Sequence, residues 1–271
     1  MLTVNVGPFP VSVGQLTLLA ALLCALAVGH LLGRRQGAGG IGSTLSDMLL
    51  IGALVARLTF VALWFEVYRS DPWGVLDIRD GGFSAWAGVL AAALVALWQG
   101  RRRPALRKPL LLGLLAGALV WGSTNAALRL NQPEQAMLPQ VALTALSGQS
   151  VDLAGLAQGR PLVLNLWASW CPPCRREMPV LAAAQQQTPG VRFVFANQGE
   201  EAGPALRYLA TSQLVLANVV LDPAGALGKS IGSRALPTTL FYDASGRLVD
   251  THLGELSAAS LASKLQQLGA R

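Results

Sequence analysis

Two cysteines three positions apart, Cys171 and Cys174, are the residues in this sequence best suited to do chemistry. They follow a continuous apolar run, residues 162–167, which predicts a buried strand. Cys171 directly precedes residues 172–187, a segment that can form a helix, and Cys174 lies near the start of that segment. We therefore expect the pair at a strand-to-helix turn, where two thiols can form and exchange a disulfide.

The expected helix would place Cys171 at its N-terminus, where free backbone amides and the helix dipole favour a negative charge. Its thiol should ionise more readily than that of a free cysteine, and the thiolate is the nucleophile in disulfide exchange. Pro172 and Pro173 suit the first helical turn, because the amide hydrogen that proline lacks has no intrahelical partner there. Cys174, one turn later, would resolve the mixed disulfide.

Cysteine pairs at this spacing also occur in zinc sites and in purely structural disulfides. A structural zinc site takes four ligands, usually from two pairs. The remaining candidates are Cys24, His30 and His252, which form no second pair along the sequence. We expect neither a metal nor an organic cofactor, since dithiol exchange needs none. A structural disulfide is the alternative to a reactive one.

This part of the chain resembles the active site of the thioredoxin superfamily, and within it the TlpA-like and ResA-like membrane-tethered reductases, through residues 167–179 (WASWCPPCRREMP). Residues 236–243 (LPTTLFYD) resemble the family's cis-proline loop and the strand after it. The resemblance implies an α/β thioredoxin-like fold over about 139–268. It also implies that Leu236 and a cis Pro237 lie against the cysteines and form the substrate groove with Trp170. From the sequence alone, Pro237 could instead begin a strand.

Two positions near the motif bear on proton transfer. Asn165 stands where thioredoxin has a buried aspartate, and an amide cannot accept the proton that the aspartate is thought to relay. Glu177 matches the glutamate of the TlpA-like pattern, three residues after Cys174. It could assist deprotonation of Cys174, but we favour a solvated glutamate on the helix surface, as is usual for this residue type.

The composition predicts two domains in different solvents. Hydrophobic residues make up 52% of the 271 residues and charged residues only 13%, which is too apolar for an average soluble protein. The long apolar runs lie in the first half. We expect a transmembrane domain at 1–124, a linker at 125–138 and a thioredoxin-like domain at 139–271. The linker contains residues 132–135 (QPEQ), and a hairpin formed by 141–143 and 150–153 is expected after it.

Four apolar runs are candidates for membrane helices, at about 13–33, 45–65, 83–98 and 109–123. The net charge of +7 comes mainly from arginines and a lysine after the first and third runs, so it gives no support for nucleic-acid binding. The positive-inside rule places these two loops in the cytoplasm. Both termini, and with them the cysteine pair, would face the periplasm of a bacterial inner membrane, a compartment that permits disulfides.

The membrane half resembles the N-terminal part of prolipoprotein diacylglyceryl transferase, through residues 6–10 (VGPFP), 57–60 (RLTF) and 79–84 (RDGGFS). The likeness stops near Ser123. Trp86 stands where that family has its essential histidine, and tryptophan cannot act as a general base. Acyl-lipid transfer is therefore not expected.

Arg57 lies inside a predicted span, where a charge usually faces a partner, a headgroup or water. It could bind an anionic lipid or a partner reductase, or it could pair with Asp47 or Glu66 near an interface. Cys24 is interpreted as a small buried hydrophobic residue, because a dithiol relay across the membrane would need a second cysteine in the spans.

These observations predict a membrane-anchored thiol-disulfide oxidoreductase. The resemblance implies net reduction of oxidised envelope proteins, for instance in cytochrome c maturation, with electrons supplied by a membrane protein. A disulfide donor or isomerase of the same fold is the first alternative, because direction depends on reduction potential. A lipid-handling protein that uses the transferase-like spans, and a non-catalytic interaction module, are the others.

Overall fold

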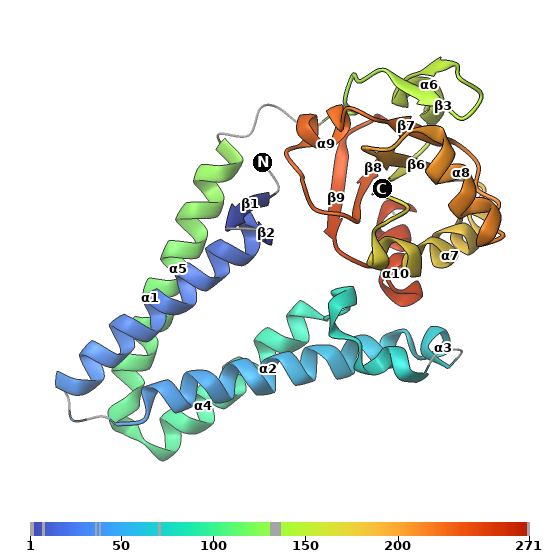
Figure 1. The fold of residues 1–271 in the computed structure, drawn as a ribbon. Helices are drawn as coiled ribbons and strands as arrows, with labels where there is room; N and C mark the ends of the chain where they lie inside the picture. Colours follow the sequence, from blue (N-terminus) through green and yellow to red (C-terminus); the bar gives the residue numbers. More distant parts are fainter. Residues whose placement is uncertain are drawn as a thin grey trace. The chain divides into compact units, whose positions relative to one another are not determined.

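The structure is a computed structural model that describes residues 3–6, 9–35, 37, 39–69, 72–130 and 137–269. The chain forms two compact units. One consists of Val13–Val75 and Gly82–Gln132, and the other of Met1–Ser12, Leu76–Gly81 and Pro133–Arg271. Each unit is described by itself below, and the ribbon is drawn in Figure 1.

The first unit is helical. Its long helices are α1 (Val13–Arg35), α2 (Ile41–Leu63), α4 (Ala85–Arg102) and α5 (Arg107–Leu130), and the short helix α3 (Phe65–Tyr68) follows α2. Among the described residues, three helices are long and apolar enough to cross a membrane: α1, α2, and the segment Pro104–Leu128 that contains most of α5. Helix α4 is also apolar but shorter, as its sequence indicated. The unit is therefore membrane-associated.

Small residues bring these helices together in pairs. On α5, a Cβ added at Gly117 would lie 2.8 Å from the carbonyl oxygen of Ala21 on α1. A Cβ added at Gly52 on α2 would likewise lie 3.1 Å from the carbonyl oxygen of Gly88 on α4. Close backbone approach at small residues is the usual way in which membrane helices gain packing energy, because lipid removes the hydrophobic driving force between them.

Arg57 is buried on α2, with 6% of its surface exposed. Its guanidinium donates hydrogen bonds to the carbonyl oxygens of Gly74 (2.8 Å), Val75 (3.1 Å) and Gly82 (2.9 Å). The rings of Tyr68 and Phe83 also lie within cation-π distance of it. Arg57 thus binds the backbone just before and just after residues 76–81 in the sequence. Neither the expected lipid or reductase partner nor the expected carboxylate partner included this arrangement.

The second unit contains a seven-stranded mixed sheet. Its strands are β3 (Leu143–Ala145), β4 (Ser150–Val151), β5 (Leu162–Trp167), β6 (Arg192–Gln198), β7 (Val219–Asp222), β8 (Thr238–Tyr242) and β9 (Leu248–Leu253). The order is β4-β3-β7-β6-β5-β8-β9, with β5 parallel to β6 and antiparallel to β8. A separate hairpin is formed by β1 (Thr3–Val6) and β2 (Phe9–Ser12).

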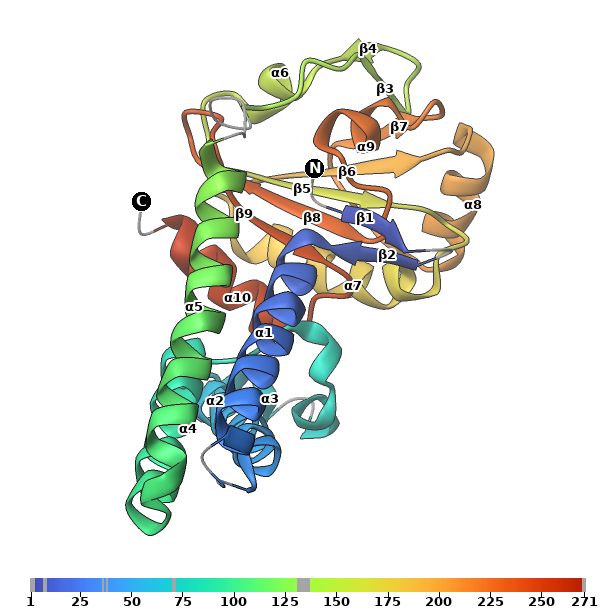
Figure 2. The same ribbon diagram turned by 90° about the vertical axis from the view of Figure 1, so that its left-hand side faces the viewer.

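Helices cover both faces of this sheet (Figure 2). Helices α7 (Pro172–Gln187), α8 (Ala202–Thr211) and α10 (Ala258–Gly269) pack on the face that carries Val163 and Trp167 of β5. Helices α6 (Leu153–Ala157) and α9 (Ala226–Ile231) pack on the face that carries the alternate residues, such as Leu164. Strand β5 is therefore buried on both sides, which explains its unbroken apolar sequence. This α/β arrangement confirms the expected fold class.

The boundaries differ from the sequence expectations in two places. Strand β3, the first strand of the hairpin expected after the linker, is Leu143–Ala145 and so begins later than the expected 141–143. Leu153 begins α6 instead of ending the second strand of that hairpin. Helix α5 continues to Leu130, so the first residues expected to be linker are helical. The expected linker residues 132–135, and Gly7 and Pro8 of the transferase-like stretch, lie outside the described residues.

Candidate functional site

The two cysteines form a disulfide at the end of β5 and the start of α7, with their Cα atoms 5.3 Å apart. Cys171 is the N-cap residue of α7, and its Sγ accepts a hydrogen bond from the backbone N–H of Cys174 at 3.3 Å. Both side chains are buried, and Cys174 has no exposed surface. The local sequence accounts for this position, because the prolines that follow Cys171 begin the helix.

The residues beside the disulfide differ in their access to solvent. Trp170 is 66% exposed and Pro172 is also exposed, whereas Pro173 is half-buried. Trp170 is therefore a large apolar side chain held in solvent next to a buried disulfide. Such a surface is available to a protein that approaches the cysteines.

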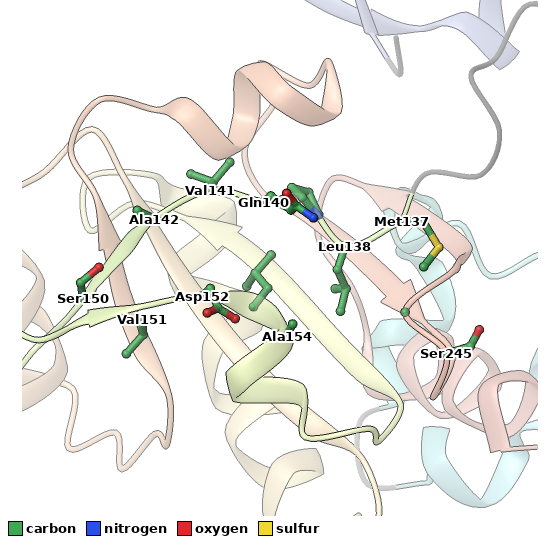
Figure 3. Close-up of a pocket in the computed structure, with 13 residues that line it drawn as sticks. Met137, Leu138, Gln140, Val141, Ala142, Ser150, Val151, Asp152, Ala154 and Ser245 are labelled. Atoms are coloured by element: carbon green, nitrogen blue, oxygen red, sulfur yellow. The ribbon is translucent and has the colours of Figure 1, made fainter.

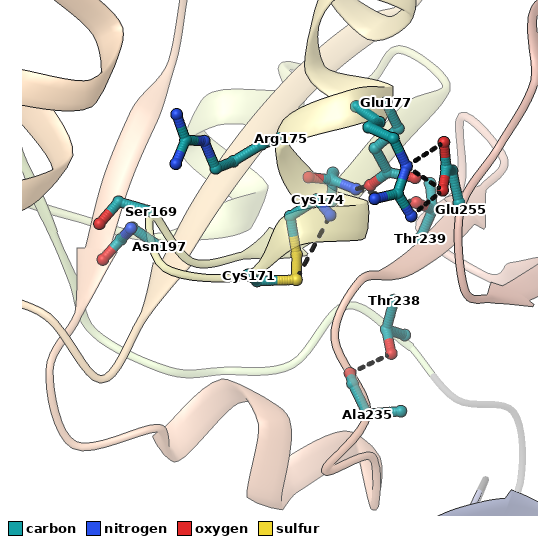
Figure 4. The surroundings of a disulfide bond; sticks show 12 residues. Ser169, Cys171, Cys174, Arg175, Glu177, Asn197, Ala235, Thr238, Thr239 and Glu255 are labelled. Carbon is teal, nitrogen blue, oxygen red and sulfur yellow. Dashed lines mark hydrogen bonds and ion pairs between the residues drawn. A yellow bond between two sulfur atoms is a disulfide. The ribbon is translucent and has the colours of Figure 1, made fainter.

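A buried polar cluster lies one helical turn beyond Cys174 (Figure 4). The Nδ2 of Asn165 on β5 donates hydrogen bonds to Oε1 of Glu177 (2.7 Å) and to Oγ1 of Thr239 on β8 (2.9 Å). The other carboxylate oxygen of Glu177 accepts from the backbone N–H of Leu256 at 3.0 Å. Glu177 therefore joins α7 to β5 and to the segment before α10.

The side chain of Glu177 has no exposed surface, so the expectation of a solvated glutamate was wrong. Burial raises the pKa of its carboxyl to about 8, and the hydrogen bonds from Leu256 and Asn165 oppose that shift. Glu177 lies on the same face of α7 as Cys174, Met178 and Leu181, all of which are buried. A carboxyl that titrates near neutral pH is thus placed one turn from Cys174.

The loop before β8 carries the expected cis-proline. The Leu236–Pro237 peptide bond is cis, Pro237 is buried, and Leu236 packs against the apolar cluster that contains both cysteines. Within this loop, Oγ1 of Thr238 donates to the carbonyl oxygen of Ala235 at 2.7 Å, and Figure 4 draws this contact beside the disulfide. The structure thus brings together the cysteine motif and the loop that the sequence placed far downstream.

A pocket of about 240 Å³ adjoins this loop. Leu166 at the end of β5 and the half-buried Leu236 line it, with Lys229 and Arg234 also contributing. The pocket combines apolar and positively charged lining residues, and Leu236 links it to the apolar cluster that contains the cysteines.

A second acidic residue, Glu200, holds the loop that leads into the cysteine motif. Its carboxylate accepts hydrogen bonds from the backbone N–H (2.7 Å) and Oγ (2.6 Å) of Ser169. It also accepts from Nδ2 of Asn197 at 2.7 Å. These bonds tie the residue before Trp170 to the end of β6 and restrict how the loop can move.

The two arginines after Cys174 have separate surface contacts. Arg176 forms a double hydrogen bond with the carboxylate of Glu255, with its Nη2 2.7 Å from Oε2. The Arg175 guanidinium lies over the ring of Tyr208, 5.2 Å from its centre. Both arginines are exposed, so water and salt screen their positive charge at the cysteine pair.

A larger pocket, of about 650 Å³, lies elsewhere in the same unit (Figure 3). It is lined by the segment 137–142, by 150–154 and by the turn residues Ser245 and Gly246. That turn follows β8, whose end pairs with Leu162 at the start of β5, whereas the cysteines follow the other end of β5. The larger pocket is therefore separate from the disulfide. Within the described ranges, no cluster of His, Cys, Asp or Glu side chains could hold a metal ion.

Thr239, Leu256, Glu200 and Ser169 were not among the predicted site residues. One signal was available for Glu177 itself: Cys174, Glu177, Met178 and Leu181 repeat at helical spacing, which predicts a common buried face. No comparable signal existed for the others, since their contacts join segments distant in sequence.

Comparison with known proteins agrees with this geometry. The Redoxin family model matches residues 132–266, and the prolipoprotein diacylglyceryl transferase model matches residues 2–126. The membrane half thus has the similarity that its sequence indicated, in a region where Trp86 replaces the expected histidine.

Relatives of the C-terminal half are thiol-disulfide proteins. The chain is 32% identical over 166 residues to the thiol:disulfide interchange protein DsbE of Escherichia coli K12, covering 58% of this chain and 88% of that protein. It is 34% identical to the DsbE of Tatumella citrea, covering 45% of this chain and 64% of that protein. It is 31% identical to the thiol-disulfide oxidoreductase ResA of Halalkalibacterium halodurans, covering 42% of this chain and 65% of that protein.

A solved structure of a secreted Mycobacterium tuberculosis disulfide oxidoreductase aligns with 48% of this chain and 96% of its own, at 28% identity and a TM-score of 0.43. The sequence relatives and the disulfide at the start of α7 agree on the chemistry of the C-terminal half. Through that half, the chain belongs to the DsbE-related family of thiol-disulfide oxidoreductases.

Proposed function

We propose that the chain is a membrane-anchored reductase of protein disulfides, in which Cys171 is the nucleophile and Cys174 the resolving cysteine. The observation that carries this proposal is the position of the disulfide at the N-terminus of α7, with Cys171 as the N-cap residue. Free amides and the helix dipole stabilise a thiolate there. The exposed Trp170 and the pocket at Leu236 provide a surface for a substrate polypeptide.

The reaction moves two electrons from the reduced cysteine pair to the substrate. The Cys171 thiolate attacks one sulfur of the substrate disulfide, which breaks that bond and releases the other substrate sulfur as a thiolate. Cys174 then loses its proton and attacks the Sγ of Cys171. The substrate sulfur that was bound to Cys171 leaves as a thiolate, and the Cys171–Cys174 disulfide seen in the structure is the product.

We propose that Glu177 is the general base that accepts the proton of Cys174. A general base works best when its pKa lies near the operating pH, and burial raises the pKa of this carboxyl to about 8. Glu177 is one turn from Cys174, and the hydrogen bonds from Asn165 and Leu256 fix the orientation of its carboxylate. Glu177 therefore accepts the proton that a buried aspartate at position 165 would otherwise accept.

The charge distribution supports a location of the cysteine pair outside the cytoplasm. Arginines lie at the end of α1, and arginines and a lysine lie around the turn from α4 to α5; positive charge marks the cytoplasmic ends of membrane helices. The substrates would then be oxidised envelope proteins, with cytochrome c apoproteins as one example. A membrane protein must return electrons to the pair, because each turnover leaves the disulfide. A disulfide donor of the same fold is the alternative.

Trapping of the mixed disulfide tests the roles of the two cysteines. With Cys174→Ser, a disulfide-containing substrate should stay covalently bound to Cys171, and reduction by dithiothreitol should release it. Cys171→Ser is the matched control and should trap nothing. Trapping by Cys171→Ser alone would reverse the assignment.

Labelling in cells tests direction and compartment. In a Cys24→Ala background, a thiol reagent that cannot cross the inner membrane should label the nucleophile Cys171 directly if the pair is kept reduced outside the cytoplasm. Labelling only after prior reduction would identify a disulfide donor. Labelling only in permeabilised cells would contradict the proposed topology.

A further inference from the structure

A cleft of about 430 Å³ lies between the end of α4 and the start of α5 in the helical unit. Leu97 on α4 and Leu110 and Leu111 on α5 give it apolar walls, and Arg101 and Arg107 line the same cleft. Leu110 is buried in the packing core of the helices, whereas Leu97 and Leu111 are more than half exposed. The cleft is therefore apolar along its length and positively charged where the two helices meet.

The lining residues show how the cleft runs. On α5 they include positions 107, 110, 111 and 114, which repeat at helical spacing and form one stripe along the helix. At 1.5 Å per residue, this stripe extends about 10 Å from Arg107 toward the apolar part of α5. The arginines thus lie at one end of a groove that continues along the membrane-facing helices.

The two arginines have unused hydrogen-bonding capacity. Arg107 donates from Nε to the carbonyl oxygen of Gly100 at 2.7 Å, which ties α5 to α4 and orients its guanidinium. Within the described ranges, its terminal nitrogens and the whole guanidinium of Arg101 have no hydrogen-bond or ion-pair partner. The nearby acid, Asp47, accepts a hydrogen bond from Gln99 instead.

Residues around the cleft add positive charge and indicate how deep the cleft lies in the membrane. Arg102, Arg103 and Lys108 belong to the same short stretch. The Arg102 guanidinium lies over the ring of Trp98, 4.2 Å from its centre. Tryptophan and arginine are typical of the headgroup level of a bilayer, where one end of the side chain meets water. The charged end of the cleft is therefore expected at that level.

From this geometry we propose that the cleft binds one anionic phospholipid. Its phosphate lies between Arg101 and Arg107, and one acyl chain packs along Leu97 and Leu111. A neutral apolar helix from another protein could cover the same leucines. It would leave the two arginines without a counter-charge, whereas an anionic headgroup at the same level supplies one. Charge complementarity selects the anionic lipid.

Lipid titration followed by native mass spectrometry tests the site in the full chain, purified in a neutral detergent. The probes are dioleoyl phosphatidylserine and dioleoyl phosphatidylcholine, which have the same acyl chains and differ in net charge. We expect one bound phosphatidylserine at a concentration roughly thirtyfold below that needed for phosphatidylcholine, since each of the two arginines favours an anionic headgroup over a neutral one.

The double variant Arg101→Gln/Arg107→Gln should lose this preference. The matched control is Arg34→Gln/Arg35→Gln, which removes two exposed arginines at the end of α1 that do not line the cleft, and it should keep the preference. The single variant Arg107→Lys retains the charge and should keep most of it. This variant and Arg101→Gln keep the test decisive if the double variant does not fold.

A soluble headgroup separates a lipid site from a phosphate site. Glycerophosphoserine and inorganic phosphate lack acyl chains, and neither should displace the bound lipid at equal concentration. Displacement by either one at that concentration would overturn the proposal. Retention of the preference by the arginine variants, equal loss in the Arg34/Arg35 control, or a protein dimer without lipid would also overturn it.

Discussion

The side-chain amide of Asn165 donates a hydrogen bond to the carboxylate of Glu177, with Nδ2 and Oε1 2.7 Å apart in a fully buried position. This contact joins the central strand β5 to the helix that carries the cysteine pair. An aspartate at position 165 would place two carboxyl groups in contact. The amide instead stabilises the charged form of Glu177 without adding a second charge.

Loss of the Glu177 carboxyl should slow resolution of the mixed disulfide. In Glu177→Gln the amide cannot accept a proton from Cys174, so we expect the resolving step to slow by about a hundredfold. Rapid quenching with an alkylating agent measures how long the mixed disulfide persists at each pH. The exposed Glu201 at the start of α8 provides a control, and Glu201→Gln should leave the step unchanged. An unchanged pH profile in Glu177→Gln would rule out the base.

The same carboxyl should make the C-terminal unit less stable as the pH rises. The pKa of Glu177 is about 8 in the folded state against an ordinary value of about 4.5, so the folded state holds the proton more tightly. Its contribution is fully present below about pH 4.5 and is lost as the pH rises to about 8. Hydrogen exchange of the β5 and β8 amides in the oxidised protein measures this trend. Glu177→Gln should flatten it over this range, and an equal slope in both proteins would contradict the assignment.

Asn165→Asp should raise the apparent pKa values of the pair that it forms with Glu177. Two carboxyl groups in contact cannot both ionise readily in a buried site, so one proton is held to higher pH. We expect the pH dependence of the resolving step to move upward. Asn165→Ser adds no charge but removes the amide hydrogen bond that opposes the raised pKa of Glu177, so this control should give a smaller upward shift than the aspartate variant. An unchanged or downward-shifted pH dependence in the aspartate variant would contradict the contact between positions 165 and 177.

The pairing of α1 with α5 should be sensitive to side-chain size at Gly117 and insensitive at Gly122. A Cβ at Gly117 would lie 2.8 Å from the Ala21 carbonyl oxygen, whereas one at Gly122 would meet nothing within 4 Å. Gly117→Leu should therefore destabilise the helical unit by about 1–3 kcal/mol, in line with overpacking. Gly122→Leu on the same helix should have little effect. Thermal unfolding in detergent measures both, and equal effects would argue against this helix pairing.

Replacement of Arg57 should loosen the segment that it binds. Lysine keeps the charge but cannot donate to the carbonyl oxygens of Gly74, Val75 and Gly82 together, so Arg57→Lys should cost about 1.5–3 kcal/mol. Arg69 pairs with Glu66 on the surface, where ion pairs contribute little, so Arg69→Lys is a suitable control. Hydrogen exchange of residues 72–75 should increase only in the Arg57 variant.

Several features could be predicted because they depend on local sequence. The apolar run of β5, the prolines at the start of α7 and the apolar lengths of α1 and α2 each carry their own signal. The cysteine pair could be assigned to a strand-to-helix turn for the same reason. The bounds of the short strands β3 and β4 differ from the expected ones, because two or three residues contain too little periodicity to locate a boundary.

Burial of charged groups could not be predicted in the same way. Glu177 was expected in solvent, since isolated glutamates are rarely buried, and Arg57 was expected to face a lipid, a partner or a carboxylate. Both are buried instead with backbone and amide partners from distant segments: Leu256 and Asn165 for Glu177, and Gly74, Val75 and Gly82 for Arg57.

The amino-acid sequence by itself determined which residues can exchange a disulfide and which segments are apolar enough for a membrane, because these depend on residue type and near-neighbour spacing. Only the tertiary structure decided that Glu177 is buried against Asn165, which also donates to Thr239, and that its pKa is about 8. The physical reason is that desolvation and hydrogen bonding depend on residues brought together by the sheet, and β5 and β8 are more than 70 positions apart where Asn165 meets Thr239.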